Sequence, residues 1–443
     1  MHTNSRGHLV IGGCDAVALA QRFGTPLYVV DEARIRRACR EYVQSFAQYY
    51  PKTRIIYAGK AFMNTAIVLL VMDEGLSIDV CSGGELHTAL AAGCPGDEIF
   101  FHGNSKTPSE VELGLDAGVH RFVADSLDEL RLIDAIARSR GQVANVMLRV
   151  TPGIEAHTHD YIRTGQIDSK FGIVIPNGDA MRAVAFAQNL SNVRLTGLHC
   201  HIGSQVFDVE PFVDAVSIMM DFAREARDQT GFVIEELNLG GGLGIAYNPS
   251  DEPISVQELA AAVGPALKGA AIRCGMPQPV LMLEPGRSIV GDAGTTLYTV
   301  NVVKHIEGVR TYVAVDGGMA DNPRVALYQA RYDAVLANKM NEPLGETVSI
   351  AGNCCESGDM LIWDITLPRV DVGDIVAVFC TGAYNFSMAS NYNRHPRPAA
   401  VLVANGQAEL IAKRETYADM CRLDVVPPRL LRACGHVAVG DNA

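Results

Sequence analysis

The chain has 443 residues, a length that predicts two domains or one barrel of about 250 residues with an addition. With 48% hydrophobic and 20% charged residues, it has the composition of a globular protein rather than a disordered one. The net charge of -13 argues against nucleic acid as a partner, because phosphate binding needs clustered Lys and Arg.

The sequence also indicates where the protein works. The opening "MHTNSRGHLVIGG" has no charged region followed by a long apolar one, so no secretory signal is predicted. The longest tight apolar run, Ala66–Met72, is too short to cross a bilayer, and no membrane association is expected. The 11 cysteines form no C-x-x-C pair, which disfavours a disulfide framework and indicates the reducing cytoplasm.

In chain order, the sequence predicts a helix in "DAVALAQRFG", a strand in "PLYVV", and then eight strands that alternate with helical segments. The expected strands are Arg54–Tyr57, Ser77–Val80, Ile99–His102, His120–Ala124, Asn145–Val150, Val193–His199, Glu235–Leu239 and Val280–Glu284. This α/β alternation predicts a closed, TIM-like (β/α)8 barrel. A doubly wound open sheet is the alternative.

Beyond about Gly286 the pattern changes to successive strand-like runs, such as "TTLYTVNVVKHI" and "PAAVLVANGQAELIAKR". They predict a C-terminal antiparallel β-sandwich or β-barrel domain, to which the N-terminal segment contributes a strand. The expected division is residues 1–35 for that N-terminal segment, 36–285 for the barrel and 286–443 for the β domain.

Candidate functional residues follow the barrel strands, whose C-terminal ends carry the catalytic groups in this fold. Lys60 in "YAGK" comes directly after the first strand, where a partly desolvated lysine can lose its proton and attack a carbonyl. Glu284 in "LEPGR" ends the eighth strand. The alternatives are a solvated surface lysine and a structural salt bridge.

The sixth and seventh strands end in two further motifs. His199 and His201 in "LHCHIG" are two residues apart, so they can ligate a metal from one face of a strand, as in barrel hydrolases. No matching ligand set accompanies them, and an imidazole can instead lie against an aromatic ring. The glycines of "LNLGGGLG" can bring backbone N–H groups close to a phosphate, or can form a simple tight turn.

Several motifs together resemble those of the diaminopimelate decarboxylases, which belong to the alanine-racemase-like, barrel-type class of pyridoxal-phosphate (PLP) enzymes. The resemblance covers nearly the whole chain. Its motifs are "YAGKA", "DVCSGGELHTALAAG", "THDYIRTGQIDSKFG", "LHCHIGSQ", "LNLGGGLGI", "LEPGRSIV", "DGGMADNPRVALY", "CESGD" and "GAYNFSMASNYN".

The resemblance implies a cofactor site for PLP. Lys60 would carry PLP as a Schiff base, His201 would stack on its ring, and Glu284 would pair with the ring nitrogen. The residues implied to hold the phosphate are Ser204, Gly240, Gly241, Gly242 and Tyr384, and Arg287 is also implied to bind the cofactor.

The resemblance also implies the reaction, which is the decarboxylation of meso-2,6-diaminopimelate to L-lysine and CO2, the last step of lysine biosynthesis. A distal carboxylate suits guanidinium groups, and a distal ammonium suits a carboxylate. The expected substrate-binding residues are Arg287, Arg324, Tyr328, Glu356 and Tyr384. The alternative is a related PLP decarboxylase that acts on another amino-acid-like substrate.

The stretch "AGNCCESGD" places two cysteines before Glu356. We interpret Cys354 as a packed residue and Cys355 as the candidate acid that reprotonates the substrate, helped by Lys60. The resemblance implies that this segment reaches the partner's site in a homodimer with shared active sites.

Overall fold

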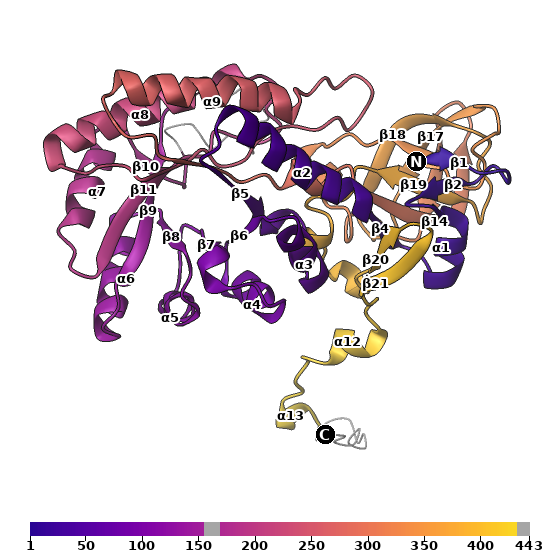
Figure 1. The fold of residues 1–443 in the computed structure, drawn as a ribbon. Coiled ribbons are helices and arrows are strands. Elements are labelled where there is room, and N and C mark those ends of the chain that lie inside the picture. The colour runs from indigo at the N-terminus through magenta and orange to yellow at the C-terminus, as the bar shows by residue number, and fades with distance from the viewer. Residues whose placement is uncertain (155–168, 432–443) are drawn as a thin grey trace.

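The computed structural model describes residues 1–154 and 169–431 of the chain. Its larger part is a closed barrel of eight parallel strands, in which β9 pairs with both β8 and β11 and so closes the ring (Figure 1). The strands are β5 (Thr53–Ala58), β6 (Ser77–Val80), β7 (Ile99–Phe101), β8 (Arg121–Ala124), β9 (Ala144–Thr151), β11 (Val193–His199), β12 (Glu236–Asn238) and β13 (Val280–Leu283). The predicted barrel is confirmed, and each expected strand lies within one residue of the observed one.

Helices cover the outside of the barrel. They are α2 (Glu32–Tyr49), α3 (Thr65–Asp73), α4 (Gly83–Ala91), α5 (Pro108–Ala117), α6 (Leu127–Ser139), α7 (Asp179–Gln188), α8 (Glu210–Thr230) and α9 (Val256–Arg273). Helix α2 precedes the first barrel strand and packs beside α9 (Figure 1). Side chains fix several helix starts, because Thr107 and Ser255 each form a capping box with the glutamate three residues later.

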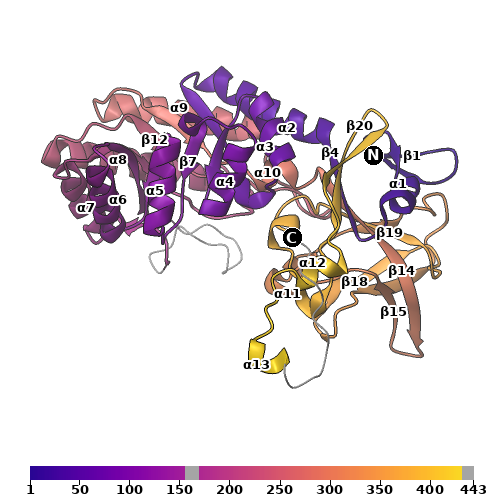
Figure 2. The same cartoon turned by 90° about the horizontal axis from the view of Figure 1, so that it is seen from below.

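A second unit, the β domain, follows the barrel in the chain (Figure 2). Its sheet runs in the order β18-β17-β15-β14-β4-β20-β21, with β19 and β16 branching from β14. The strands are β4 (Leu27–Asp31), β14 (Gly294–Ile306), β15 (Arg310–Val315), β16 (Ala334–Leu336), β17 (Glu346–Ala351), β18 (Met360–Leu367), β19 (Ile375–Phe379), β20 (Ala399–Ala404) and β21 (Gln407–Ala412).

The predicted C-terminal β domain is confirmed, and its mostly antiparallel sheet also contains two parallel pairings. Strand β15 is parallel to β17, and β20 is parallel to β4. The second pairing arises because β4, from the N-terminal segment, inserts between β14 and β20. The sequence predicted that this segment adds a strand to the domain, but not its place in the sheet. The predicted boundaries after residues 35 and 285 remain a prediction.

Short elements complete the chain. A small sheet lies at the N-terminus, and α12 and α13 project from the β domain at the C-terminal end (Figure 1). These elements are β1 (His2–Thr3), β2 (Leu9–Ile11), β3 (Cys14–Asp15), α1 (Ala16–Phe23), β10 (Ile173–Val174), α10 (Arg287–Val290), α11 (Arg324–Tyr328), α12 (Tyr417–Cys421) and α13 (Pro428–Leu431).

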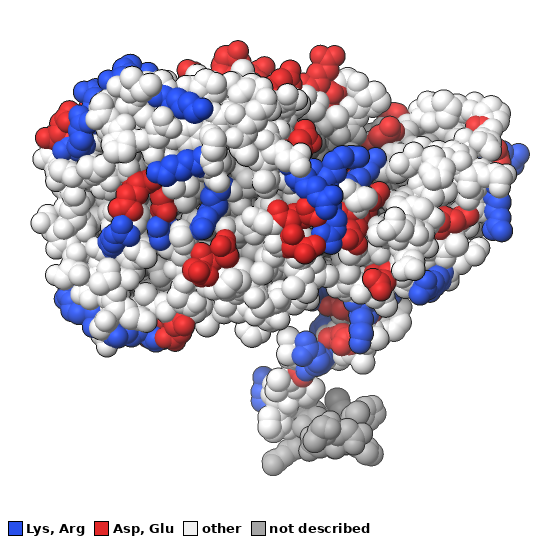
Figure 3. Space-filling model, in the orientation of Figure 1, with Lys and Arg blue, Asp and Glu red and all other residues white. Residues whose placement is uncertain are grey.

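Basic and acidic side chains lie next to one another on the face drawn in Figure 3. On helix α2, for example, Arg36 and Arg40 both form ion pairs with Glu74, at 2.7 and 2.6 Å. Among the described helices, none combines the length and the apolar character that a membrane crossing requires.

Candidate active site

A cavity of about 300 Å³ opens where the C-terminal ends of the barrel strands face the β domain. A second cavity of about 330 Å³ adjoins it and shares Lys60, His201 and Glu284 with it. The first cavity also contains Ser204, Gly241, Gly242, Arg287, Arg324, Tyr328 and Tyr384. The structure therefore brings ten of the sequence-predicted site residues into one place, from both domains.

Lys60 sits in a short turn, Gly59–Ala61, that directly follows β5 and points the residue into both cavities. Its burial in the barrel mouth lowers the pKa, but Cys81, Tyr384 and Asp79 outweigh this effect and raise the pKa above its ordinary value. Desolvation therefore favours loss of the Lys60 proton, as expected, but these three neighbours outweigh it in the chain alone, and the role of Lys60 as a nucleophile stays a prediction.

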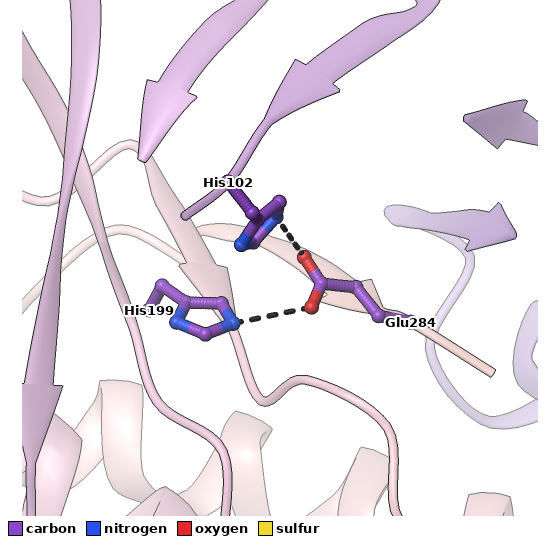
Figure 4. Close-up of side chains that lie close together, drawn as sticks. All are labelled: His102, His199 and Glu284. Carbon is purple, nitrogen blue, oxygen red and sulfur yellow. Dashed lines mark hydrogen bonds and ion pairs between the residues drawn. The ribbon is translucent and has the colours of Figure 1, made fainter. Parts of the chain in front are cut away.

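Glu284 follows β13 and is held by three side chains from elsewhere in the barrel, two of which, His102 and His199, are drawn in Figure 4. Its Oε1 lies 2.7 Å from His102 Nε2 and accepts a hydrogen bond from Asn238 Nδ2 at 2.7 Å, while Oε2 lies 3.1 Å from His199 Nε2. Burial raises the pKa of Glu284, but the two histidines outweigh it and hold the pKa well below its usual range. Glu284 is thus a fixed, ionised carboxylate.

The histidines of "LHCHIG" have different surroundings. Burial lowers the pKa of His199 to about 4, so its neutral ring donates from Nε2 to Glu284. His201 lies beyond the end of β11 in the wall shared by the two cavities. Among the described residues, the group whose ligand atoms lie close enough together to hold a metal is therefore His102, His199 and Glu284, rather than the H-x-H pair.

The glycine turn follows β12 and leaves no room for side chains. A Cβ on Gly241 would lie 2.2 Å from the carbonyl oxygen of Glu284, and one on Gly242 would lie 2.4 Å from that of Gly203. Within the described chain, the backbone N–H groups of Gly241 and Gly242 have no hydrogen-bond partner. Two donors at the cavity wall are therefore available to an anion.

Two arginines approach the same cavity from helix starts, Arg287 at α10 and Arg324 at α11. Arg287 donates from Nη2 to Ser204 Oγ at 3.0 Å, and its guanidinium carbon lies 4.8 Å from the centre of the Tyr384 ring. Tyr384 adopts a positive φ of 63° and donates its backbone N–H to the carbonyl oxygen of Ala61. This bond ties the β domain to the lysine turn.

The loop between β17 and β18 does not reach this cavity in its own chain. Cys355 and Glu356 are both exposed and do not line the site, whereas Cys354 is buried, as predicted. The backbone of the loop is nevertheless well held. Cys354 N donates to Asp359 Oδ2 and Cys355 N donates to Asn393 Oδ1, each at 2.7 Å.

Sequence reasoning missed several residues of the site. The second cavity is also lined by Cys81, His102, Asn104, Arg149 and Phe171. His102 could have been found, because it is a polar residue at the end of a barrel strand, like those that were selected. Most of the predicted motif at Thr158–Gly172, from Thr158 to Asp168, lies outside the described residues.

The family model described as "Pyridoxal-dependent decarboxylase, pyridoxal binding domain" matches residues 32–291 of the chain. The chain belongs to this family of pyridoxal-dependent decarboxylases. This membership argues against the alternative of a metal-dependent barrel hydrolase. It agrees with the arrangement of the site, in which a lysine, a fixed carboxylate and a glycine turn surround one cavity.

Individual relatives are similar over nearly their whole length. The diaminopimelate decarboxylase of Bacillus subtilis is 53% identical over 422 residues, which cover 95% of this chain and 96% of the relative. A solved diaminopimelate decarboxylase from M. jannaschii in complex with L-lysine has a TM-score of 0.91 and 40% identity, covering 96% and 98% of the two chains. The Helicobacter pylori enzyme complexed with L-lysine has a TM-score of 0.84 and 32% identity, covering 92% and 99%.

Proposed function

We propose that the protein is a PLP-dependent decarboxylase that releases CO2 from meso-2,6-diaminopimelate and leaves L-lysine, as the last step of lysine biosynthesis. The observation that carries this proposal is that two buried guanidinium groups, those of Arg287 and Arg324, share a cavity with Lys60. After one amino-acid head is placed at the reacting position, diaminopimelate still presents a second carboxylate. Arginine suits such a carboxylate. A site that forms a simple diamine would have no distal carboxylate for these arginines to bind.

The residues present fit PLP. The free N–H groups of Gly241 and Gly242, with Ser204, suit its phosphate, and the ionised Glu284 suits its ring nitrogen. Lys60, which lines the cavity between them, would hold the cofactor covalently. When bound, PLP would supply the electron sink that lets the bond to the departing carboxylate break.

The chain's own residues then supply orientation and charge. His102, His199 and Asn238 would keep Glu284 ionised and in place, and His201 would form one wall of the ring site. Arg287, Arg324, Tyr328 and Tyr384 would hold the distal head of the substrate. Lys60, whose raised pKa favours its protonated form, would hold a proton at Nζ and so help the acid that reprotonates the substrate.

We further propose a cytoplasmic homodimer in which Cys355 and Glu356 complete the partner's site, as proton donor and as ligand for the distal ammonium. Their exposure in a rigid loop supports this role. Large side chains exposed on strand β18 and helix α12, Trp363 at 52% and Tyr417 at 82%, also suit burial against a second copy.

The test of the function is CO2 release from meso-diaminopimelate, lysine, ornithine and arginine with added PLP. We expect turnover of diaminopimelate alone. Turnover of ornithine without diaminopimelate would refute the substrate, and turnover of none would favour another amino-acid-like substrate.

A second experiment tests the shared site. Inactive Lys60→Ala and Cys355→Ala subunits are mixed, and we expect partial recovery of activity. Demonstrated heterodimers without recovered activity would contradict the cross-chain role of Cys355.

A further inference from the structure

The two arginines of the cavity carry charges that no described carboxylate neutralises. Arg287 and Arg324 are each only 6% exposed, and the side-chain partners that the described residues give them are hydroxyl groups, those of Ser204, Tyr247 and Tyr332, rather than carboxylates. Arg287 Nε is buried and has no hydrogen-bond partner there. Because an unpaired buried charge is costly, this arrangement is suited to an anion that arrives from outside.

One phenol, that of Tyr247, contacts both guanidinium groups, while Ser204 also bonds Arg287 and Tyr332 also bonds Arg324. Tyr247 Oη accepts a hydrogen bond from Arg287 Nη1 at 2.5 Å and another from Arg324 Nη1 at 2.8 Å. The two guanidinium carbons also lie 5.7 and 5.1 Å from the centre of the Tyr247 ring. Tyr247 comes from the loop after the glycine turn and is not itself part of the cavity lining.

The position of Tyr247 is itself well determined. It is 8% exposed, and its ring packs edge-on against Tyr332 at 5.5 Å and 84°. Its backbone N–H donates to Asp251 Oδ2 at 2.9 Å. The phenol is therefore a rigid support that sets the direction of both arginines.

We propose that Tyr247 is a neutral positioning residue that aims Arg287 and Arg324 together at one anionic oxygen group of the bound ligand. This inference rests on the proposed function. A carboxylate in the same place would orient the arginines equally well but would neutralise them. A phenol accepts both hydrogen bonds and leaves the positive charge for the ligand, so it contributes to the preference for substrates with a distal carboxylate.

Two anions share the chemistry that such an arginine pair recognises, the distal carboxylate of the substrate and the phosphate of the cofactor. L-lysine keeps the distal carboxylate of diaminopimelate, whereas cadaverine lacks it. PLP carries the phosphate, whereas pyridoxal lacks it. Each pair of ligands therefore isolates one of the two anions.

The test uses Tyr247→Phe, which removes only the hydroxyl, and Tyr50→Phe as the matched control. Tyr50 is also buried, but its hydroxyl bonds Pro279 O before β13, at the other end of the barrel. Calorimetry measures binding of L-lysine and cadaverine to the holoenzyme, and apoenzyme titration measures binding of PLP and pyridoxal. Tyr247→Phe should weaken the binding of L-lysine or of PLP about tenfold, because one hydrogen bond to each guanidinium group is lost. The binding of the counterpart that lacks the anionic group, cadaverine or pyridoxal, should stay within twofold.

A second variant tests the neutrality of the support even if Tyr247→Phe folds poorly. Tyr247→Glu places a carboxylate against both arginines, so we expect the preference for the anionic ligand to disappear while the fold is kept. The role of Tyr247 would be overturned if Tyr247→Glu still preferred the anionic ligand of a pair. It would also be overturned if Tyr247→Phe bound both ligands of a pair equally more weakly than the wild type. A wild-type enzyme without any preference for L-lysine over cadaverine would overturn the proposed substrate as well.

Discussion

Replacing Glu284 by Gln keeps the size of the side chain and removes its charge, and we expect kcat to fall about 10- to 100-fold. The carboxylate already takes three contacts at 2.7, 2.7 and 3.1 Å, which fix it for a further donor on the cofactor ring. A charge-assisted hydrogen bond in such a buried place contributes about 1.5–3 kcal/mol. Since about 1.4 kcal/mol corresponds to a factor of ten, losing it gives the stated range.

The assay for this prediction is single-turnover CO2 release from enzyme that is saturated with PLP, so that cofactor loss is not read as slow chemistry. Glu236→Gln is the matched control, because Glu236 is also a buried glutamate of a barrel strand but begins β12, at the opposite end of the barrel. An unchanged kcat in Glu284→Gln, or an equal loss in both variants, would refute the role of Glu284.

Three further outcomes are expected. Lys60→Ala should abolish turnover. It should also abolish the covalent attachment of PLP to the chain after borohydride reduction, which mass spectrometry measures. Attachment at the wild-type level would contradict the role of Lys60 as the residue that binds PLP. Gly241→Ala should weaken PLP binding at least tenfold in apoenzyme titrations, since its Cβ would lie 2.2 Å from a carbonyl oxygen; unchanged affinity would argue against the phosphate turn. Burial raises the pKa of Glu236, but His120 and Arg121 lower it to about 2, so its stabilisation is present above pH ~4.5 and is lost toward pH 2. Urea unfolding should show that the free energy of unfolding falls by about 3 kcal/mol more in the wild type than in Glu236→Gln between pH ~4.5 and pH ~2. An equal fall in both proteins would contradict this.

The sequence was sufficient for the barrel because its strands are short apolar runs separated by helical segments, a pattern set locally. Because catalytic residues follow the strands of such a barrel, the predicted strand ends also identified Lys60 and Glu284 as candidates. The sequence could not show that β15 is parallel to β17, because pairing between strands that are not consecutive depends on tertiary packing.

The electrostatics of the site were also beyond the sequence. The pKa of Lys60 rises because β6 and the segment after it bring Asp79 and Cys81 near its amine, an effect that no local pattern contains. Tyr247 belongs to no predicted motif. Its contacts with Arg287 and Arg324 join residues 40 and 77 positions away in the chain.

The central claim is that this cavity removes one carboxylate of diaminopimelate with PLP. The most direct measurement follows L-lysine and CO2 together as the PLP-loaded enzyme consumes meso-diaminopimelate. We predict that the two products appear in equal amounts and that neither forms in the absence of PLP. CO2 without L-lysine, or equal rates with and without the cofactor, would contradict the claim.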